Sequence, residues 1–558
     1  MNRRTILQAF IAAALAPLSA FARHGRGVGA AGGVPVPNIA ALPLGDNSIG
    51  DWNNGGGPTN SSWAINSRWQ DTTGAWLTRV SNATHIGLDA QTTTTDFGNE
   101  YASNGPLISR PFGTNLDTYH IIGYDWGGGI VYVFDYQIGV GALAGTKKTI
   151  PIGNSEALCQ AFSTNPNDSA HIMYISDRAA GNSVIHRYDI QAQAYATNSI
   201  FTGGTASYAT SQDTAGWLQT NWSGSHLTFA APFGGGGNFC SLDLNTGVLT
   251  TTTSASTNEM KIGKGATKVA TLCGGTAGEK FWFIGSNHLT AAVVSGAYST
   301  QTHSNMGESK FYIFNGDAAN FALQVFDLGT DPGSNGGTWN GTESDKYTVS
   351  GSQTLDSDEH PQMGWNQTGA GTSEWFCFSV CNGSGSQSLV SANAWSVDSG
   401  SIYKTSVSYG SGHYDNSVRG VTAVRILTGA NITGKLNKVA SYGALVAGTF
   451  FFDVNNTHGG GAGVLYAWMP GGVTPVSVTE LLAQPVLGES LGYAKQDGSE
   501  RRRLCYTYRR EIYNGSSYRY SGDCYANWSP DGRIATFKSN WGIPGGRTDM
   551  VVVEVPHT

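Results

Sequence analysis

The amino-acid sequence predicts an all-β fold, in which short strands and polar turns follow one another through one large domain. Glycine contributes 76 of the 558 residues and only 13% of the residues are charged, a composition that favours strands and turns over helices. After the N-terminal region, apolar stretches are short and are separated by Gly, Asn, Asp and Ser, without the spacing of an amphipathic helix. We therefore expect a succession of β-hairpins.

The first 22 residues predict an export signal that looks like the twin-arginine type. Arg3 and Arg4 precede an apolar run at 9–16, and small residues near position 22 suit a cleavage site. The run is shorter than the ~20 residues that span a bilayer, so a membrane anchor is the weaker interpretation. We expect a mature protein without a membrane span, located in the periplasm or outside the cell.

The rest of the chain divides into a short arm and one domain. Residues 23–48 are rich in Gly, Pro and Ala and predict a linker or extended arm, whereas 49–558 predict a single domain. The formal net charge is −7, so the chain lacks the basic surface expected of a nucleic-acid-binding protein. Nothing in the sequence indicates the oligomeric state.

The C-terminal stretch 527–555 is the most informative local pattern. Pro530-Asp531-Gly532 predicts a turn, because Pro presets φ, Asp can bond its own backbone and Gly tolerates positive φ. Alternate residues of 534–538 are expected on opposite faces of a strand, and the apolar run 550–553 predicts a strand buried on both faces. The stretch therefore predicts turn, strand, turn and strand, which is half of a four-stranded sheet.

This stretch resembles the repeat of TolB-like and oligogalacturonate-lyase-like β-propellers. Asn221-Trp222-Ser223, followed by a strand, repeats the Asn-Trp-Ser of 527–529. Such a resemblance implies radially stacked blades, closed by pairing of the terminal strand with N-terminal sequence. Successive repeats start ~45 to 85 residues apart, compared with ~40 to 50 in regular propellers. We expect seven blades, with six to eight compatible; a right-handed β-helix, the alternative, would show shorter and more regular rungs.

Pairs of strands joined by turns recur along the whole domain. The expected strand pairs lie at 119–126 and 130–136, 171–177 and 184–190, 226–229 and 240–244, 311–314 and 323–328, 374–380 and 392–397, 442–452 and 464–468, and 534–538 and 550–555. A further unit is expected from 260 to 293 and includes a strand at 280–284.

Seven cysteines in an exported chain suggest disulfides. Cys505 and Cys524 are equidistant from Asn514-Gly515, the strongest short hairpin signal. A two-residue turn there would place the two cysteines opposite each other, so we predict a Cys505–Cys524 disulfide. Cys377 and Cys381 are compatible with either a small closed loop or two unpaired thiols.

The most polar segment before an expected strand is 356–362. Asp356, Asp358, Glu359 and His360 could bind Ca²⁺ or Mn²⁺ through carboxylate and imidazole groups, or His360 could supply a general base. The alternative interpretation is a solvated acidic turn.

A basic and phenolic hairpin is expected at 501–520. Strand alternation places Tyr506, Tyr508 and Arg510 on one face, and Arg509 and Tyr513 on the other. Arg pairs bidentately with carboxylates and Tyr can stack on a sugar or transfer a proton. A purely structural ladder of Tyr and Arg is the alternative.

A third polar run at 409–419 carries His413, Tyr414 and Arg419. His120 and His171 are further histidines near strand starts, where a hydrogen-bonded structural role is the more common interpretation.

The resemblance implies a secreted propeller acting on an acidic polysaccharide, and we expect a lyase that cleaves a uronate-containing polymer by β-elimination. That reaction needs a cation beside the carboxylate, a base and an acid. Arg509 or Arg510 suits the first role, His360 or His413 the second, and Tyr508 the third. Tyr506, Tyr513, Arg419 and Tyr414 are candidate substrate contacts. A non-catalytic TolB-like binding propeller and a glycoside hydrolase with two converging carboxylates are the alternatives.

Overall fold

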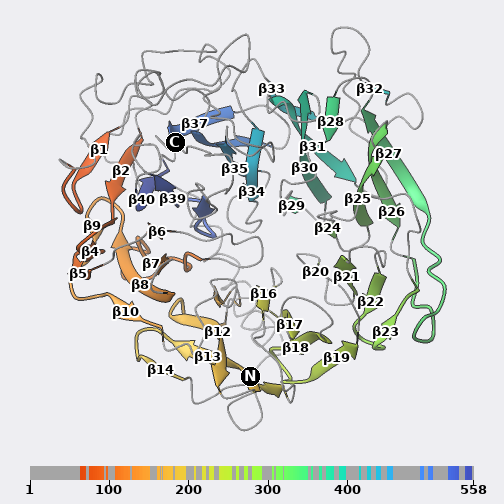
Figure 1. Ribbon diagram of the computed structural model, residues 1–558, viewed down its shortest axis with the longest axis horizontal. Helices are drawn as coiled ribbons and strands as arrows, with labels where there is room; N and C mark the ends of the chain where they lie inside the picture. The colour runs from red at the N-terminus through yellow and green to blue at the C-terminus, as the bar shows by residue number, and fades with distance from the viewer. Residues whose placement is uncertain are drawn as a thin grey trace, which may run out of the picture.

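The computed structural model describes the chain, with gaps, over residues 63–98, 107–150, 160–195, 206–253, 259–291, 305–349, 353–455, 490–506 and 526–555. All regular structure within these residues is β, in agreement with the expected all-β fold. The described strands form eight sheets of four or five strands and one small sheet of three. Figure 1 shows the larger sheets arranged in a ring, which makes the fold a β-propeller.

We number the large sheets 1 to 8 in chain order. Sheet 1 has the strand order β10-β8-β7-β6 with β9 also beside β8, and sheet 2 has the order β11-β12-β13-β14 with β15 also beside β13. Their strands are β6 (Phe97–Gly98), β7 (Thr118–Asp125), β8 (Ile130–Gln137), β9 (Gly141–Ala142), β10 (Lys148–Thr149), β11 (Gln160–Phe162), β12 (Ile172–Ala179), β13 (Asn182–Asp189), β14 (Ala194–Tyr195) and β15 (Ala206–Tyr208).

Sheets 3, 4 and 5 continue around the ring, and β16, β20 and β24 lie nearest its centre (Figure 1). Their strands are β16 (Gly216–Thr220), β17 (His226–Ala231), β18 (Asn238–Asp243), β19 (Leu249–Thr253), β20 (Glu259–Ile262), β21 (Val269–Cys273), β22 (Lys280–Phe283), β23 (His288–Leu289), β24 (Asn305–Met306), β25 (Lys310–Asp317), β26 (Asn320–Asp327), β27 (Glu343–Val349) and β32 (Tyr414–Asp415).

Sheets 6, 7 and 8 complete the ring, and the small three-stranded sheet follows β2. Their strands are β28 (Gln353–Leu355), β29 (Met363–Asn366), β30 (Ser373–Asn382), β31 (Leu389–Val397), β33 (Val424–Thr428), β34 (Lys435–Ala440), β35 (Thr449–Asn455), β36 (Ser490–Lys495), β37 (Arg501–Tyr506), β38 (Asn527–Trp528), β39 (Ile534–Ser539), β40 (Asp549–Glu554), β1 (Arg68–Gln70), β2 (Trp76–Arg79), β3 (Ser81–Asn82), β4 (His85–Ile86) and β5 (Asp89–Ala90).

Sheet 8 closes the ring with strands from both ends of the domain. Its order is β1-β2-β40-β39-β38, and β40 is antiparallel to both neighbours, with Val553 opposite Ala535 on one side and Leu77 on the other. The predicted closure by the terminal strand is therefore confirmed. The eight sheets number one more than the seven blades expected and lie within the range of six to eight.

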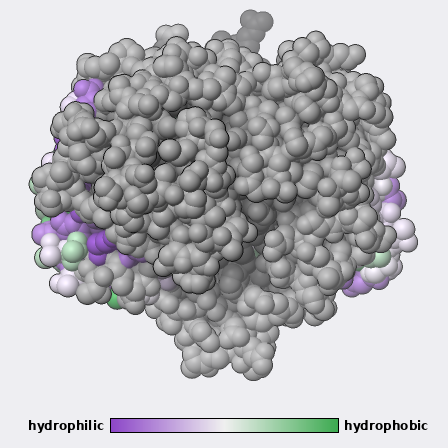
Figure 2. All heavy atoms as spheres, turned by 45° about the horizontal axis from the view of Figure 1, so that its top comes forward, coloured by the Kyte–Doolittle hydropathy of each residue, from purple (hydrophilic) through white to green (hydrophobic). Residues whose placement is uncertain are grey.

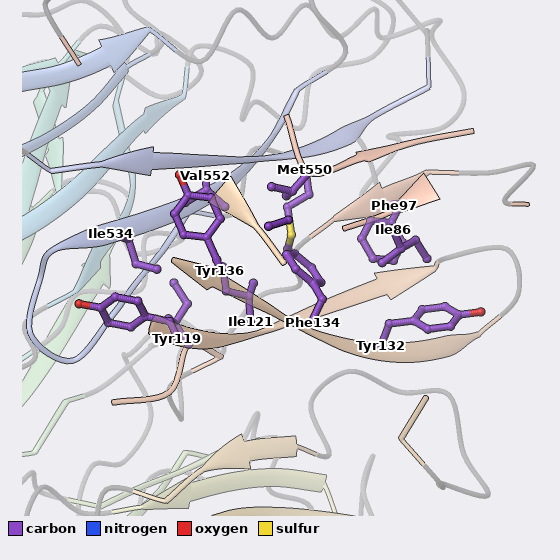
Figure 3. Close-up of a cluster of buried hydrophobic side chains, with 13 residues drawn as sticks. Ile86, Phe97, Tyr119, Ile121, Tyr132, Phe134, Tyr136, Ile534, Met550 and Val552 are labelled. Carbon is purple, nitrogen blue, oxygen red and sulfur yellow. The ribbon is translucent and has the colours of Figure 1, made fainter. Parts of the chain in front are cut away.

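The apolar core is a series of layers between neighbouring sheets. On β40, Met550 and Val552 pack toward sheet 1, whereas Val551 and Val553 pack toward sheet 7, as expected for a strand buried on both faces. Figure 3 shows the layer between sheets 8 and 1, where Tyr136 and Phe134 meet side chains of β39 and β40. The next layers join sheet 1 to sheet 2 and sheet 2 to sheet 3.

The predicted turn at 530–532 joins β38 to β39. Gly532 has φ 70°, and the Ser529 hydroxyl donates to Asp531 at 2.6 Å. Tyr119 of sheet 1 also donates its hydroxyl to Asp531, at 2.7 Å. The turn therefore links two sheets in addition to reversing the chain.

One expected strand partner differs from the one observed. The strand β35 was expected beside 464–468, but its two neighbours are β34 and β36, because a later segment fills that position. The structure pairs β37 with β36, with Cys505 opposite Leu491; the partner expected for β37 at 518–520 lies outside the described residues, so that pairing stays a prediction. Residues 464–468 and 507–525 lie outside the described residues.

The described surface is mainly polar. Its exposed large apolar side chains are Leu88, Val140 and Val248, and the described residues on the side seen in Figure 2 are mostly hydrophilic. None of the described residues forms a helix that could cross a membrane.

Candidate functional site

A group of interacting titratable side chains lies between sheets 1 and 2. His120 Nδ1 is 2.6 Å from Asp135 Oδ1, and His120 Nε2 is 2.7 Å from His171 Nδ1. His120 is 1% exposed, whereas His171 is half-buried. The three groups form a chain that leads from a carboxylate, through a buried imidazole, to a second imidazole nearer the surface.

Strand alternation explains why these side chains meet. His120 and Asp135 are directly opposite each other on β7 and β8. Tyr119 and Tyr136, one position away on each strand, pack toward sheet 8, so His120 and Asp135 face sheet 2. His171 immediately precedes β12 of that sheet, and the contact between His120 and His171 therefore crosses the junction between two blades.

Aromatic rings enclose the buried part of the group. The Phe112 ring lies 4.3 Å from the His120 ring and 4.9 Å from the His171 ring, between centroids. Phe162 stacks on His120 at 6.1 Å. Phe112 is itself half-buried, so the group has an apolar rim that reaches the surface.

Burial disfavours the charged form of His171. Loss of hydration lowers the pKa of His171, and the neighbouring His120 lowers it further; Asp189 and Asp135 act in the opposite direction. Within the described residues, the structure shows no hydrogen bond at His171 Nε2. A neutral imidazole with an unengaged ring nitrogen can accept a proton or ligate a metal.

A second polar network adjoins the first. Arg187 forms an ion pair with Asp168, whose carboxylate also accepts hydrogen bonds from the hydroxyls of Ser163, at 2.5 Å, and Tyr174, at 3.3 Å. Arg110 donates from Nη2 to the backbone oxygen of Asp168. Asp168 is three residues before His171, so one short loop brings the guanidinium of Arg110 and the imidazole to the same junction.

Arg110 has unused donor capacity. A guanidinium offers five N–H donors, and the buried Nε of Arg110 has no partner among the described residues. Burial lowers the pKa of Arg110 and Asp168 opposes that shift, but a guanidinium remains charged in proteins. Arg110 is therefore a half-buried cation at the same junction, with one buried donor that has no partner among the described residues.

Two other described histidines also contact polar neighbours. His226 begins β17 directly opposite Asp243, and its Nδ1 is 3.0 Å from the hydroxyl of its neighbour Ser225. His288 Nδ1 lies 2.7 Å from the exposed Asp331. The expectation that strand-start histidines are hydrogen-bonded holds for His120 and His171, but their pairing across two blades goes beyond a local structural role.

The site residues predicted from the sequence lie almost entirely outside the described residues. These are Asp356, Asp358, Glu359, His360, His413, Arg419, Tyr508, Arg509, Arg510 and Tyr513. Their roles stay predictions, as does the Ca²⁺ or Mn²⁺ site at 356–360. Among the residues that the structure does describe, no group of three His, Cys, Asp or Glu is arranged to hold a metal ion.

Two predicted contact residues and one predicted cysteine have a described position. Tyr414 lies in β32, opposite Val349 at the end of sheet 5 that Figure 1 shows at the outer rim. Tyr506 ends β37 opposite Ser490, at the end of sheet 7 away from β34. Cys505 is buried and Cys524 lies outside the described residues, so their disulfide stays a prediction.

The described topology defines the protein as a β-propeller. No protein-family description matches the sequence, and no curated protein matches it. The chain is similar in structure to an oligogalacturonate lyase from Vibrio parahaemolyticus, with 9% identity, a TM-score of 0.42, and coverage of 88% of this chain and 97% of that one.

Two further solved structures are similar over most of the chain. The computationally designed Ika8 protein has 10% identity and a TM-score of 0.38, with 82% of this chain and 98% of that one covered. The WD40 repeats of RRP9 have 7% identity and a TM-score of 0.33, with 72% and 94% covered. At these identities the likenesses concern the fold and carry nothing about activity.

Proposed function

We propose that this propeller is exported and cleaves a uronate-containing polysaccharide by β-elimination. The observation that carries the proposal is the half-buried His171, neutral and backed by His120 and Asp135, with Arg110 at the same junction. Elimination requires a base at the carbon next to a carboxylate and a cation at the carboxylate itself. His171 and Arg110 have the chemistry of these two roles.

The elimination moves one proton to a base and breaks one carbon–oxygen bond. His171 Nε2 takes the proton from the carbon beside the uronate carboxylate, while Arg110 N–H groups bind that carboxylate and stabilise its developing charge. The electron pair forms a carbon–carbon double bond, the bond to the leaving oxygen breaks, and an acid protonates that oxygen. Tyr508 stays the candidate acid, and His360, His413, Arg509 and Arg510 remain sequence-based candidates for the other roles.

Activity assays with three polymers test the proposal. The exported chain is incubated with polygalacturonate, alginate and ulvan, and ultraviolet absorbance of the unsaturated product is followed. His171→Gln is expected to lower kcat about 10²- to 10⁴-fold, the usual contribution of a general base. His226→Gln, which alters a half-buried histidine in sheet 3, serves as the matched control and retains activity.

The assay also separates the alternatives. Absence of an unsaturated product with all three polymers contradicts the lyase proposal. New reducing ends without ultraviolet absorbance would indicate hydrolysis, and tight binding without turnover would indicate a binding propeller. If His360→Gln or His413→Gln abolishes activity while His171→Gln does not, the base is one of the histidines predicted from the sequence.

A further inference from the structure

We propose that Asp135 and His120 are positioning residues that fix the tautomer of His171, so that its Nδ1 carries the hydrogen and its Nε2 the free lone pair. This inference rests on the proposed function for its catalytic meaning, but the tautomer itself is a property of the folded protein. It is carried by the two short contacts, 2.6 Å and 2.7 Å, in line through His120.

The hydrogen positions follow from the acceptor at one end of the chain. An ionised carboxylate only accepts hydrogen bonds, so His120 must donate to Asp135 through Nδ1–H. In a neutral His120, Nε2 is then an acceptor, and the contact at 2.7 Å requires His171 to donate through Nδ1–H. The remaining nitrogen of His171, Nε2, is left with its lone pair.

A second placement of protons satisfies the same contacts and has a different consequence. If His120 is an imidazolium, both its nitrogens donate, His171 Nδ1 becomes an acceptor, and a neutral His171 carries its hydrogen on Nε2. In that state His171 cannot accept a proton at Nε2. The two placements therefore give opposite chemistry at the atom that faces away from His120.

Charged groups from four elements surround His171. Asp135 on β8 and Asp189 at the end of β13 favour a cation at this position, whereas His120 on β7 and Lys148 on β10 disfavour one. The ammonium of Lys148 is held 2.8 Å from the backbone oxygen of Ile190. The two carboxylates oppose the lowering of the His171 pKa by burial and by His120, and in the proposed reaction Asp135 stabilises the positive charge on His171 through His120.

Replacing Asp135 by Asn removes the charge that sets the direction of the hydrogen bonds from His171 through His120. The amide can donate to His120 Nδ1, which moves the His120 hydrogen to Nε2. His120 then donates to His171 Nδ1, and His171 takes the tautomer with hydrogen on Nε2. We therefore expect Asp135→Asn to shift the tautomers of two histidines in two different blades.

Heteronuclear NMR of isotope-labelled histidine ring nitrogens measures these tautomers directly. The signals are assigned with His171→Gln and His120→Gln. At neutral pH the native protein is expected to show hydrogen on Nδ1 of both residues, and Asp135→Asn to increase the Nε2–H form of His171. Asp243→Asn, at the carboxylate opposite His226, is the matched control and leaves the His171 signal unchanged.

Two results would overturn the inference. One is a native His171 with its hydrogen on Nε2 or an imidazolium at His120. The other is an unchanged His171 tautomer in an Asp135→Asn protein whose circular dichroism and thermal unfolding show a native fold.

The tautomer inference and the lyase proposal can be tested separately. If no polymer is cleaved but the tautomers are as expected, the positioning of His171 by Asp135 and His120 is supported and the lyase proposal is contradicted. If the protein is a lyase, Asp135→Asn is expected to lower kcat about 10²- to 10⁴-fold with little change in KM. If Asp135→Asn leaves kcat unchanged, the positioning of His171 by Asp135 and His120 has no part in the reaction.

Discussion

Removal of the Asp549 side chain should destabilise the ring at its closure. Asp549 is on β40, the strand contributed by the C-terminus, and its Oδ2 is 2.6 Å from Nη2 of Arg79 on the N-terminal strand β2. Arg547 approaches Oδ1 at 2.8 Å. Asp549→Ala leaves the guanidinium of Arg79 in the closing sheet without this carboxylate.

Burial sets the magnitude of this effect. The side chains of Arg79 and Asp549 are 6% and 0% exposed, so water cannot replace the missing partner. Loss of one member of a buried ion pair costs about 3–5 kcal/mol. The ion pair between Arg68 and Glu554 is in the same sheet, but Arg68 is 27% exposed, and such an accessible pair contributes about 1 kcal/mol or less.

Urea unfolding followed by tryptophan fluorescence compares the two sites. We expect Asp549→Ala to lower the free energy of unfolding by about 3–5 kcal/mol, and Arg68→Gln, the control, by about 1 kcal/mol or less. Equal losses for the two variants, or a loss below about 1 kcal/mol for Asp549→Ala, would refute the claim that a buried charge pair secures the closure.

Three further changes test the packing between sheets and the titration of a histidine. Tyr119→Phe deletes the hydroxyl bond between sheets 1 and 8 and should cost about 1–3 kcal/mol in urea unfolding. Gly123→Ala would place a Cβ 2.4 Å from Phe97 Cζ, whereas Gly285→Ala meets nothing within 4 Å; the first should cost about 1–3 kcal/mol and the second nearly nothing. Burial lowers the pKa of His226, and Asp243 opposes that shift. The contribution of neutral His226 to the free energy of unfolding is therefore fully present above the unfolded pKa of about 6.5 and is lost as pH falls through the folded pKa. In His226→Gln, the free energy of unfolding should vary less with pH in that range.

The ring and its closure could be predicted because they depend on patterns within single strands. The run 550–553 is apolar at every position, so it had to be buried on both faces, and the structure places it between two other strands. Seven of the eight expected units lie in seven different sheets, and the eighth, 442–452 with 464–468, contributes only β35 to sheet 7 among the described residues. Long connections obscured which segment completes each sheet, as with β36, which follows β35 only after a gap of 34 residues between Asn455 and Ser490.

The candidate site could be predicted only in part. Counting from the expected turn at 127–129 would pair His120 with Tyr136, whereas the structure pairs Asp125 with Ile130 and therefore His120 with Asp135. Their contact with His171 spans 51 residues and two sheets. It depends on how neighbouring blades stack, which strand periodicity does not specify.

Comparison of two His–Asp pairs suggests how a structural motif could acquire chemistry. In sheet 3, His226 and Asp243 are opposite each other at the start of β17 and the end of β18. In sheet 1, His120 and Asp135 have nearly the same arrangement on β7 and β8, but the next blade adds His171 at the far nitrogen. That addition connects the half-buried carboxylate of Asp135 to a half-buried imidazole, so that in the proposed reaction a proton accepted by His171 is stabilised by a charge two groups away. Under the proposed function, one more histidine at a blade junction supplies the base, without any change to the strands that form the blades.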